Sequence, residues 1–154
     1  MYVTYTFDLA ATAGSGNVFI GHFVASAAQN LHVVNVQVDV LETTTTANHV
    51  TCELHRLSAV GTSSVVVAGV KRDATAPKAI GSSAARTYSV DPTSSGVIDG
   101  ANIPAGPASS PWVAQYPLGH VKIAPSGSAA VVVNRNGTTG TPACKARVTV
   151  FEEG

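Results

Sequence analysis

The five histidines and their acidic neighbours are the side chains of this sequence best suited to bind a metal ion. They are His22, His32, His49, His55 and His120. His49, Glu53 and His55 share one face if their segment is a strand, because side chains alternate along a strand. His49 and His55 are then roughly 20 Å apart at about 3.3 Å per residue, which is too far for one ion. We therefore expect no metal site and no cofactor.

Catalytic motifs are equally scarce. The chain has no Gly-x-Ser-x-Gly elbow, no P-loop and no Gly-x-Gly-x-x-Gly fingerprint. Asp91 and Asp99 are candidates for a pair of catalytic carboxylates, but loop aspartates usually form Asx-turns. Trp112, Tyr116 and Tyr88 are candidates for a sugar-stacking platform, although a content of only 6% aromatic residues favours core or interface packing. The sequence predicts no enzyme.

The two cysteines, Cys52 and Cys144, occupy inward positions of alternating segments. A disulfide between them is possible if their strands adjoin. The first residues have no basic region and no continuous apolar stretch, so we expect a cytosolic product with no signal peptide or membrane anchor. Cytosolic thiols stay reduced, which favours two small buried hydrophobic side chains over a disulfide.

Alternation with a period of two residues is the main structural signal. In residues 31–42, valines at even positions from Val34 to Val40 alternate with Asn35, Gln37 and Asp39. This pattern predicts a strand with one buried and one solvated face. Similar segments predict further strands at 1–9, 18–26, 49–57, 65–70, 87–90, 121–124, 129–134 and 143–151. Residues 91–117 contain five prolines among Gly and Ser, so strands there are predicted to be short or absent.

Composition supports an all-β domain. Valine occurs 23 times and leucine six times among 154 residues, a balance unsuited to a helix bundle. Charged residues make up 12% of the chain, about half the usual share, and the net charge is zero. Neutrality argues against an electrostatic nucleic-acid binder, and a hydrophobic content of 45% argues against disorder. We expect one domain, residues 1–154, folded as an antiparallel β-sandwich.

Several short motifs resemble a group of virion proteins. The segment 53–57 (Glu-Leu-His-Arg-Leu) precedes a Gly/Ser turn, a valine run and the segment 71–77 (Lys-Arg-Asp-Ala-Thr-Ala-Pro). Later come 123–127 (Ile-Ala-Pro-Ser-Gly) and the end 147–153 (Arg-Val-Thr-Val-Phe-Glu-Glu). In outline, residues 18–153 resemble small jelly-roll head decoration or cement proteins of tailed bacteriophages, with His55 where that group tends to have Arg.

The resemblance implies a jelly-roll topology and a structural role on the virion. The protein would bind the outer surface of the phage head, with the major capsid protein as its partner, and would self-associate as a homotrimer. It implies no catalytic residues. We also expect no cofactor and, from the neutral charge and the lack of a long apolar run, no nucleic-acid or membrane partner. Two other classes remain open: a receptor- or carbohydrate-binding sandwich of a tail or fibre that stacks sugars on Trp112 and Tyr116, and a β-sandwich enzyme.

Partner contacts are predicted in two segments, the N-terminal strand and the proline-rich stretch. A chain terminus and an irregular loop can reach a neighbour without disturbing the core. The predicted contact residues are Asn102, Ile103, Pro104, Pro107, Pro111, Trp112, Tyr2 and Tyr5.

Overall fold

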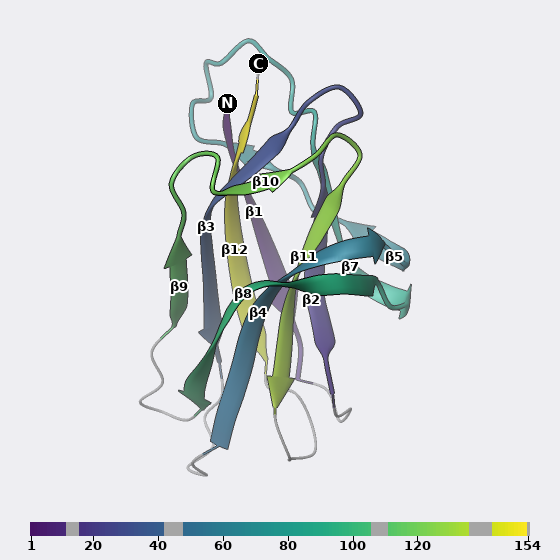
Figure 1. The fold of residues 1–154 in the computed structure, drawn as a ribbon, viewed down its shortest axis with the longest axis vertical. Helices are drawn as coiled ribbons and strands as arrows, with labels where there is room; N and C mark the ends of the chain where they lie inside the picture. Colours follow the sequence, from purple (N-terminus) through teal and green to yellow (C-terminus); the bar gives the residue numbers. More distant parts are fainter. Residues whose placement is uncertain (12–15, 42–47, 106–110, 136–142, 154) are drawn as a thin grey trace.

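Two antiparallel β-sheets, packed face to face, make up the protein (Figure 1). The computed structural model describes residues 1–11, 16–41, 48–105, 111–135 and 143–153. These residues form strands and connections and no helix, so none of them forms an apolar helix long enough to span a membrane. The predicted all-β antiparallel sandwich is confirmed.

The first sheet, here called sheet I, has six strands. They are β1 (Tyr2–Leu9), β3 (Leu31–Val40), β6 (Val70–Lys71), β9 (Trp112–Gln115), β10 (Val121–Ile123) and β12 (Cys144–Glu152). Their order is β10-β3-β12-β1-β6, and β9 pairs with another part of β3. The first and last strands of the chain are therefore neighbours.

The second sheet, sheet II, also has six strands. They are β2 (Val18–Val24), β4 (Asn48–Ala59), β5 (Thr62–Val66), β7 (Ser83–Val90), β8 (Thr93–Ala105) and β11 (Ser128–Arg135). Their order is β5-β7-β2-β11-β4-β8, which makes β5 and β8 the two edges. Most of the predicted strands appear at or near their predicted positions.

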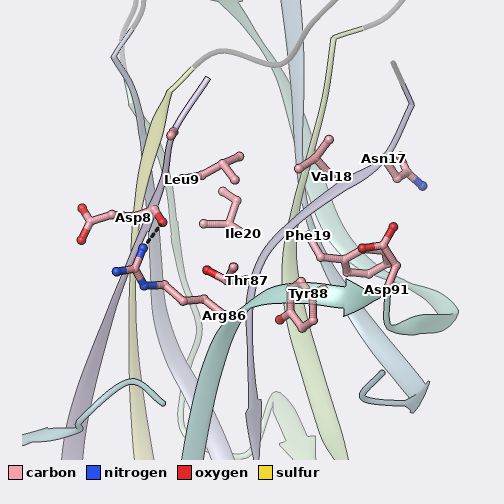
Figure 2. A pocket seen from close by; sticks show the side chains of 11 residues that line it. Asp8, Leu9, Asn17, Val18, Phe19, Ile20, Arg86, Thr87, Tyr88 and Asp91 are labelled. Carbon is pink, nitrogen blue, oxygen red and sulfur yellow. Dashed lines mark hydrogen bonds between the residues drawn. The ribbon is translucent and has the colours of Figure 1, made fainter. Parts of the chain in front are cut away.

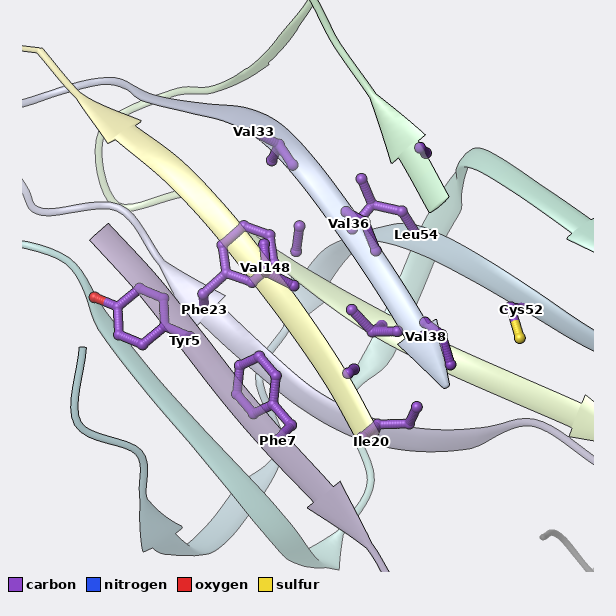
Figure 3. Packing of buried hydrophobic residues seen from close by; sticks show 14 of the residues in the cluster. Tyr5, Phe7, Ile20, Phe23, Val33, Val36, Val38, Cys52, Leu54 and Val148 are labelled. Atoms are coloured by element: carbon purple, nitrogen blue, oxygen red, sulfur yellow. The ribbon is translucent and has the colours of Figure 1, made fainter. Parts of the chain in front are cut away.

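The core lies between the sheets, and valine is its commonest residue (Figure 3). Its largest fully buried hydrophobic side chains include Tyr5, Phe7, Phe23, Ile20 and Leu54. The sheets approach closely at Gly21, where a Cβ atom would lie 2.1 Å from the Phe7 ring. Any larger residue at that position would have to push the two sheets apart.

One detail of the predicted alternation in β3 is wrong. Val33, Val36 and Val38 belong to the core, whereas Val34 is half-buried and lies outside the core cluster. The cause is a β-bulge, because Thr149 pairs with Asn35 while Val150 pairs with Val33. A bulge inserts one unpaired residue, here Val34, so the inward positions of β3 before the bulge are odd-numbered and those after it are even-numbered.

The prediction for the proline-rich stretch is also wrong. Residues Thr93–Ala105 form β8, a strand of 13 residues paired with β4. As an edge strand, β8 tolerates Gly, Ser and a terminal Pro without hydrophobic alternation. Gly100 is required there, since a Cβ atom would lie 2.9 Å from the Cys52 carbonyl oxygen and 2.7 Å from Glu53 Cγ.

A buried carboxylate fastens the end of β12 to the segment before β7. Glu152 is 1% exposed and accepts hydrogen bonds from the Ser82 N–H (2.7 Å), the Ser82 hydroxyl and the Gly81 N–H (3.2 Å). Tyr5 shares a hydrogen bond of 2.6 Å with Ser82 Oγ. Burial alone would raise the pKa of Glu152, but these hydrogen bonds and nearby Lys78 lower it below its ordinary value. The carboxylate is therefore ionised in the fold at neutral pH.

Candidate functional site

A row of cross-strand partners runs across all six strands on the outer face of sheet II. None of its members carries a carboxylate, an ammonium or a guanidinium group. We call it the valine–histidine row, and it comprises Val66, Ala85, His22, Ala130, His55 and Val97. Ala130 faces outward because its neighbours Ala129 and Val131 belong to the core. Five strand spacings of about 4.8 Å give the row a length of about 24 Å.

The adjacent row is also uncharged. It consists of Ser83, Val24, Ser128, Leu57 and Ser94. The middle of both rows is buried by neighbouring side chains, and Ala130 has no exposed surface. The ends are open, with Val66 83% and Val97 57% exposed. These two rows form an uncharged surface, built largely of small side chains, with exposed hydrophobic residues at its ends. Surfaces of this kind commonly mark a protein contact.

His22, Tyr88 and Phe19 form an aromatic group on this face. The Nδ1 atom of His22 is hydrogen-bonded to the Tyr88 hydroxyl at 2.8 Å, and the Phe19 ring meets Tyr88 edge-on at 6.3 Å between centroids. Burial lowers the pKa of His22, so its neutral form is favoured. Burial, and then the charge of Asp91, raise the pKa of Tyr88. Both groups are uncharged at neutral pH.

His55 is the centre of a hydrogen-bonded chain with Glu53 and Ser94. Because a carboxylate only accepts, His55 Nε2–H donates to Glu53 Oε2 at 2.6 Å. In the neutral imidazole Nδ1 then accepts from the Ser94 hydroxyl at 2.9 Å. The order serine, histidine, carboxylate is that of a nucleophile, a base and an orienting acid.

The surroundings of this chain do not complete an acyl-transfer site. The Gly96 N–H donates to Ser94 Oγ itself at 3.2 Å, so it does not face the position of an oxyanion. A shallow hollow of about 300 Å³ is lined by Glu53 and Val97 but not by Ser94. The chain instead satisfies a buried imidazole and ties β8 to β4 where their register shifts.

A second hollow, of about 370 Å³, opens between the end of β1 and the end of β7 (Figure 2). Its lining is largely apolar. Arg86 projects into it and donates from Nη1 to the backbone oxygen of Asp8 at 2.7 Å. The Asp8 carboxylate lies 3.7 Å from Lys145 Nζ. The Arg86 guanidinium is thus held by a backbone oxygen, and the Asp8 carboxylate is directed to Lys145. Residues 12–15, close to the lining in sequence, are outside the described residues.

Three of the predicted contact residues are buried, which argues against their side chains as contacts. Tyr5 is 1% exposed, and Ile103 and Trp112 are each 7% exposed within the core cluster. They alternate with outward residues on their strands, and the strand β8 was not foreseen. Trp112 is therefore also excluded from a sugar-stacking platform.

Three other predicted contact residues are exposed at the surface. Tyr2 is 38% exposed at the start of β1, and Pro111 is exposed just before β9. Asn102 is exposed and accepts a hydrogen bond from Thr51 at 2.6 Å. Pro104 pairs in register with His49, but its side chain is not described, and Pro107 lies outside the described residues.

Cys52 and Cys144 are buried thiols, in agreement with their predicted inward positions, and no disulfide joins them. Burial raises the pKa of Cys52 to about 12, with smaller contributions from Cys144 and Glu53, so the thiol is unreactive at neutral pH. No group of three or more His, Cys, Asp or Glu side chains within the described ranges is placed to hold a metal ion.

The valine–histidine row was not predicted from the sequence. Alternation identifies the outward residues of one strand, but a row depends on the register between six strands. No local sequence signal marks the row, because its His and Val residues have unlike neighbours along the chain. Comparison with protein-family models, curated proteins and solved structures finds no match.

Proposed function

We propose that this protein decorates the outer surface of a phage capsid and binds there through the outer face of sheet II. The observation that carries the proposal is the valine–histidine row with its uncharged neighbour. A solvated sheet face ordinarily alternates with charged or strongly polar residues. Two adjacent rows without an ionised group, ended by exposed Val66 and Val97, favour contact with another protein.

We also propose that the sandwich has jelly-roll topology. The support is the strand order, β1-β12-β3-β10 in sheet I and β2-β11-β4-β8 in sheet II. In this order the last strand lies between the first and the third, and β11 lies between β2 and β4. Eight strands arranged in this way make two Greek keys. Strands β5, β6 and β7 then form an insertion between β4 and β8.

Reinforcement would come from repetition. Each copy buries apolar surface against the major capsid protein, at about 25 cal/mol per Å² before association costs. Copies linked as homotrimers bind the shell at several points, and this multivalency raises the effective strength of each contact. The proposed location is therefore the capsid surface of the virion, and the proposed role is structural rather than catalytic.

A binding assay with capsids assembled without this protein tests the proposal. Val66→Lys and Val97→Lys place a charge at each exposed end of the row, and Val113→Lys on β9 of sheet I is the matched control. We expect each row variant to reduce co-sedimentation with capsids at least about tenfold, because an unpaired ammonium group resists desolvation. Equal binding of all three variants would contradict the proposed face.

The location and the assembly state have their own tests. Cryo-electron microscopy of the parent virion should show this density on the symmetry axes of the head, and light scattering should give a trimeric mass. Density at the tail tip, or too few copies to occupy those axes, would exclude capsid decoration.

A further inference from the structure

The outer face of sheet I carries a row of different chemistry. This threonine–amide row comprises Val70, Thr4, Thr149, Asn35 and Gln115. Thr4 and Thr149 share a hydrogen bond of 3.0 Å between their hydroxyl oxygens. The side-chain amides of Asn35 and Gln115 have no hydrogen-bond partner among the residues that the structure describes. Each amide therefore offers an unused donor and an unused acceptor on this face.

A groove of about 500 Å³ lies over this row, a volume typical of small-molecule sites. Thr149, Asn35 and Gln115 line it, and Thr149 and Gln115 are two strand spacings, about 10 Å, apart. The groove thus combines these hydroxyl and amide groups with the apolar side chains of Val34 and Leu118. This mixture suits a ligand that has both hydroxyl groups and apolar ring faces.

An aromatic side chain stands at each side of the groove. Tyr116 is held by its hydroxyl, which donates to Asp99 at 2.8 Å, and its ring stacks on His120 with 6.2 Å between centroids. On the other side Tyr2 meets the Phe151 ring edge-on at 5.0 Å. Both rings are fixed before any ligand binds, which lowers the entropy cost of binding.

Arg72 is the ionised residue among those that line the groove. Its guanidinium carbon lies 5.9 Å from the centre of the Tyr2 ring, and its backbone N–H donates to the backbone carbonyl oxygen of Tyr2 at 3.0 Å. None of the described residues that line the groove is Asp or Glu, so they do not supply the carboxylate ligands of a divalent cation. A single cation is also too little for a nucleic-acid backbone. A guanidinium group matches a carboxylate with two parallel hydrogen bonds.

We propose that this groove binds an oligosaccharide that carries a carboxylate, such as a uronic or sialic acid sugar. Asn35 and Gln115 bind its hydroxyl groups, Tyr2 and Tyr116 contact its ring faces, and Arg72 pairs with its carboxylate. The site is on sheet I, opposite the face proposed to bind the capsid, so each proposal stands or fails separately.

Nuclear magnetic resonance titration of the isolated protein provides the test. The probes are tri-galacturonate and sialyllactose, with the methyl ester of the first and lactose as neutral counterparts. We expect the acidic sugars to shift the side-chain NH₂ signals of Asn35 and Gln115 and to bind more tightly than their neutral counterparts. Shifts confined to other residues, or no saturable shift with any of the four sugars up to about 10 mM, would overturn the proposal.

Three variants separate the contributions. Gln115→Ala should weaken binding of all these sugars about tenfold, the effect of one lost hydrogen bond of ordinary to high strength. Arg72→Ala should weaken only the acidic sugars, and at least about tenfold. Gln37→Ala is the control, since Gln37 is on the same face of β3 but is bonded to Asp39 and does not line the groove. If Gln115→Ala or Arg72→Ala instead splits an oligomer in sedimentation, the groove is an interface between copies and the proposal is wrong.

Discussion

The two outer faces of this sandwich follow the same alternation but have different chemistry. On sheet II the valine–histidine row places Ala130 at its centre, with no exposed surface, between the imidazoles of His22 and His55. On sheet I the threonine–amide row places Thr149 at its centre, half-buried, between Thr4 and Asn35. The middle of the sheet II row is buried by its own neighbouring side chains, whereas the sheet I row leaves hydrogen-bonding groups accessible to solvent.

This difference shows how a sheet face acquires a role. On sheet II Nδ1 of His22 and both ring nitrogens of His55 are bonded within the chain, so a protein partner gains apolar contact and leaves few groups unsatisfied. On sheet I the side-chain amides of Asn35 and Gln115 have no hydrogen-bond partner among the described residues. Burying them against an apolar surface would therefore cost desolvation free energy. The first face suits a protein contact and the second suits a polar ligand.

The largest expected effect comes from a carboxylate placed at the centre of each row. Ala130→Glu should destabilise the protein by about 3 kcal/mol, because no exposed surface is left for the larger, charged side chain. Thr149→Glu, on the half-buried counterpart, should cost about 1 kcal/mol or less. Urea unfolding of both variants measures the difference. Equal losses would mean that the two faces are equally open.

Much of the fold was predictable from the sequence, because one buried face per strand imposes alternation. Residues 31–42 and 143–151 are examples, and they pair as β3 and β12. β8 was missed because an edge strand can be built from Ser and Gly without a hydrophobic period. The bulge at Val34 was missed because it depends on the partner strand β12, which the local pattern does not contain.

The candidate sites were much less predictable. Tyr2 and Tyr116 were singled out from the sequence, and both line the groove on sheet I. Gln115 directly precedes Tyr116 in the sequence, but Asn35 and Thr149 lie on β3 and β12, and only the sheet register brings these two to the same groove. In the Ser94–His55–Glu53 chain, the spacing of Glu53 and His55 placed both on one strand face, but Ser94 comes from β8, and its pairing with β4 could not be predicted from spacing.

The next largest expected loss of stability comes from removing the charge of Glu152, at the end of β12 in sheet I. Glu152→Gln should cost about 2 kcal/mol at pH 7, because the carboxylate accepts three hydrogen bonds in a buried position. The folded pKa is lower than the ordinary value of 4.5, so the ionised group stabilises the fold above that pH. This contribution is lost as the pH falls below 4.5. Wild-type and variant stabilities, measured by urea unfolding, should therefore converge in acid.

Mild acid should affect sheet II first. The folded pKa of His22 lies below its ordinary value of 6.5, so protonation favours the unfolded chain and stability falls as the pH drops below that value. The groups that face His22 are Tyr88 on β7 and, beyond Ala130, His55 with Glu53 on β4. His22→Gln keeps a hydrogen-bonding side chain but does not titrate. Its stability should fall less than that of the wild type between pH 7 and pH 5, and an identical fall would assign the effect to another group.

The smallest expected effects come from removing one hydroxyl group from each face. Ser94→Ala leaves Nδ1 of buried His55 without its donor, which should cost about 1 to 2 kcal/mol. Thr4→Val removes the bond to Thr149 on sheet I but keeps the branched shape that suits a strand. Because Thr4 and Thr149 are only half-buried, water can replace the lost partner, and the cost should stay below about 0.5 kcal/mol. The same urea series compares the two losses of unfolding free energy. If Thr4→Val costs as much as Ser94→Ala, the threonine hydroxyls are as shielded from water as His55. Sheet I would then lack the solvent-exposed polar groups that a sugar requires.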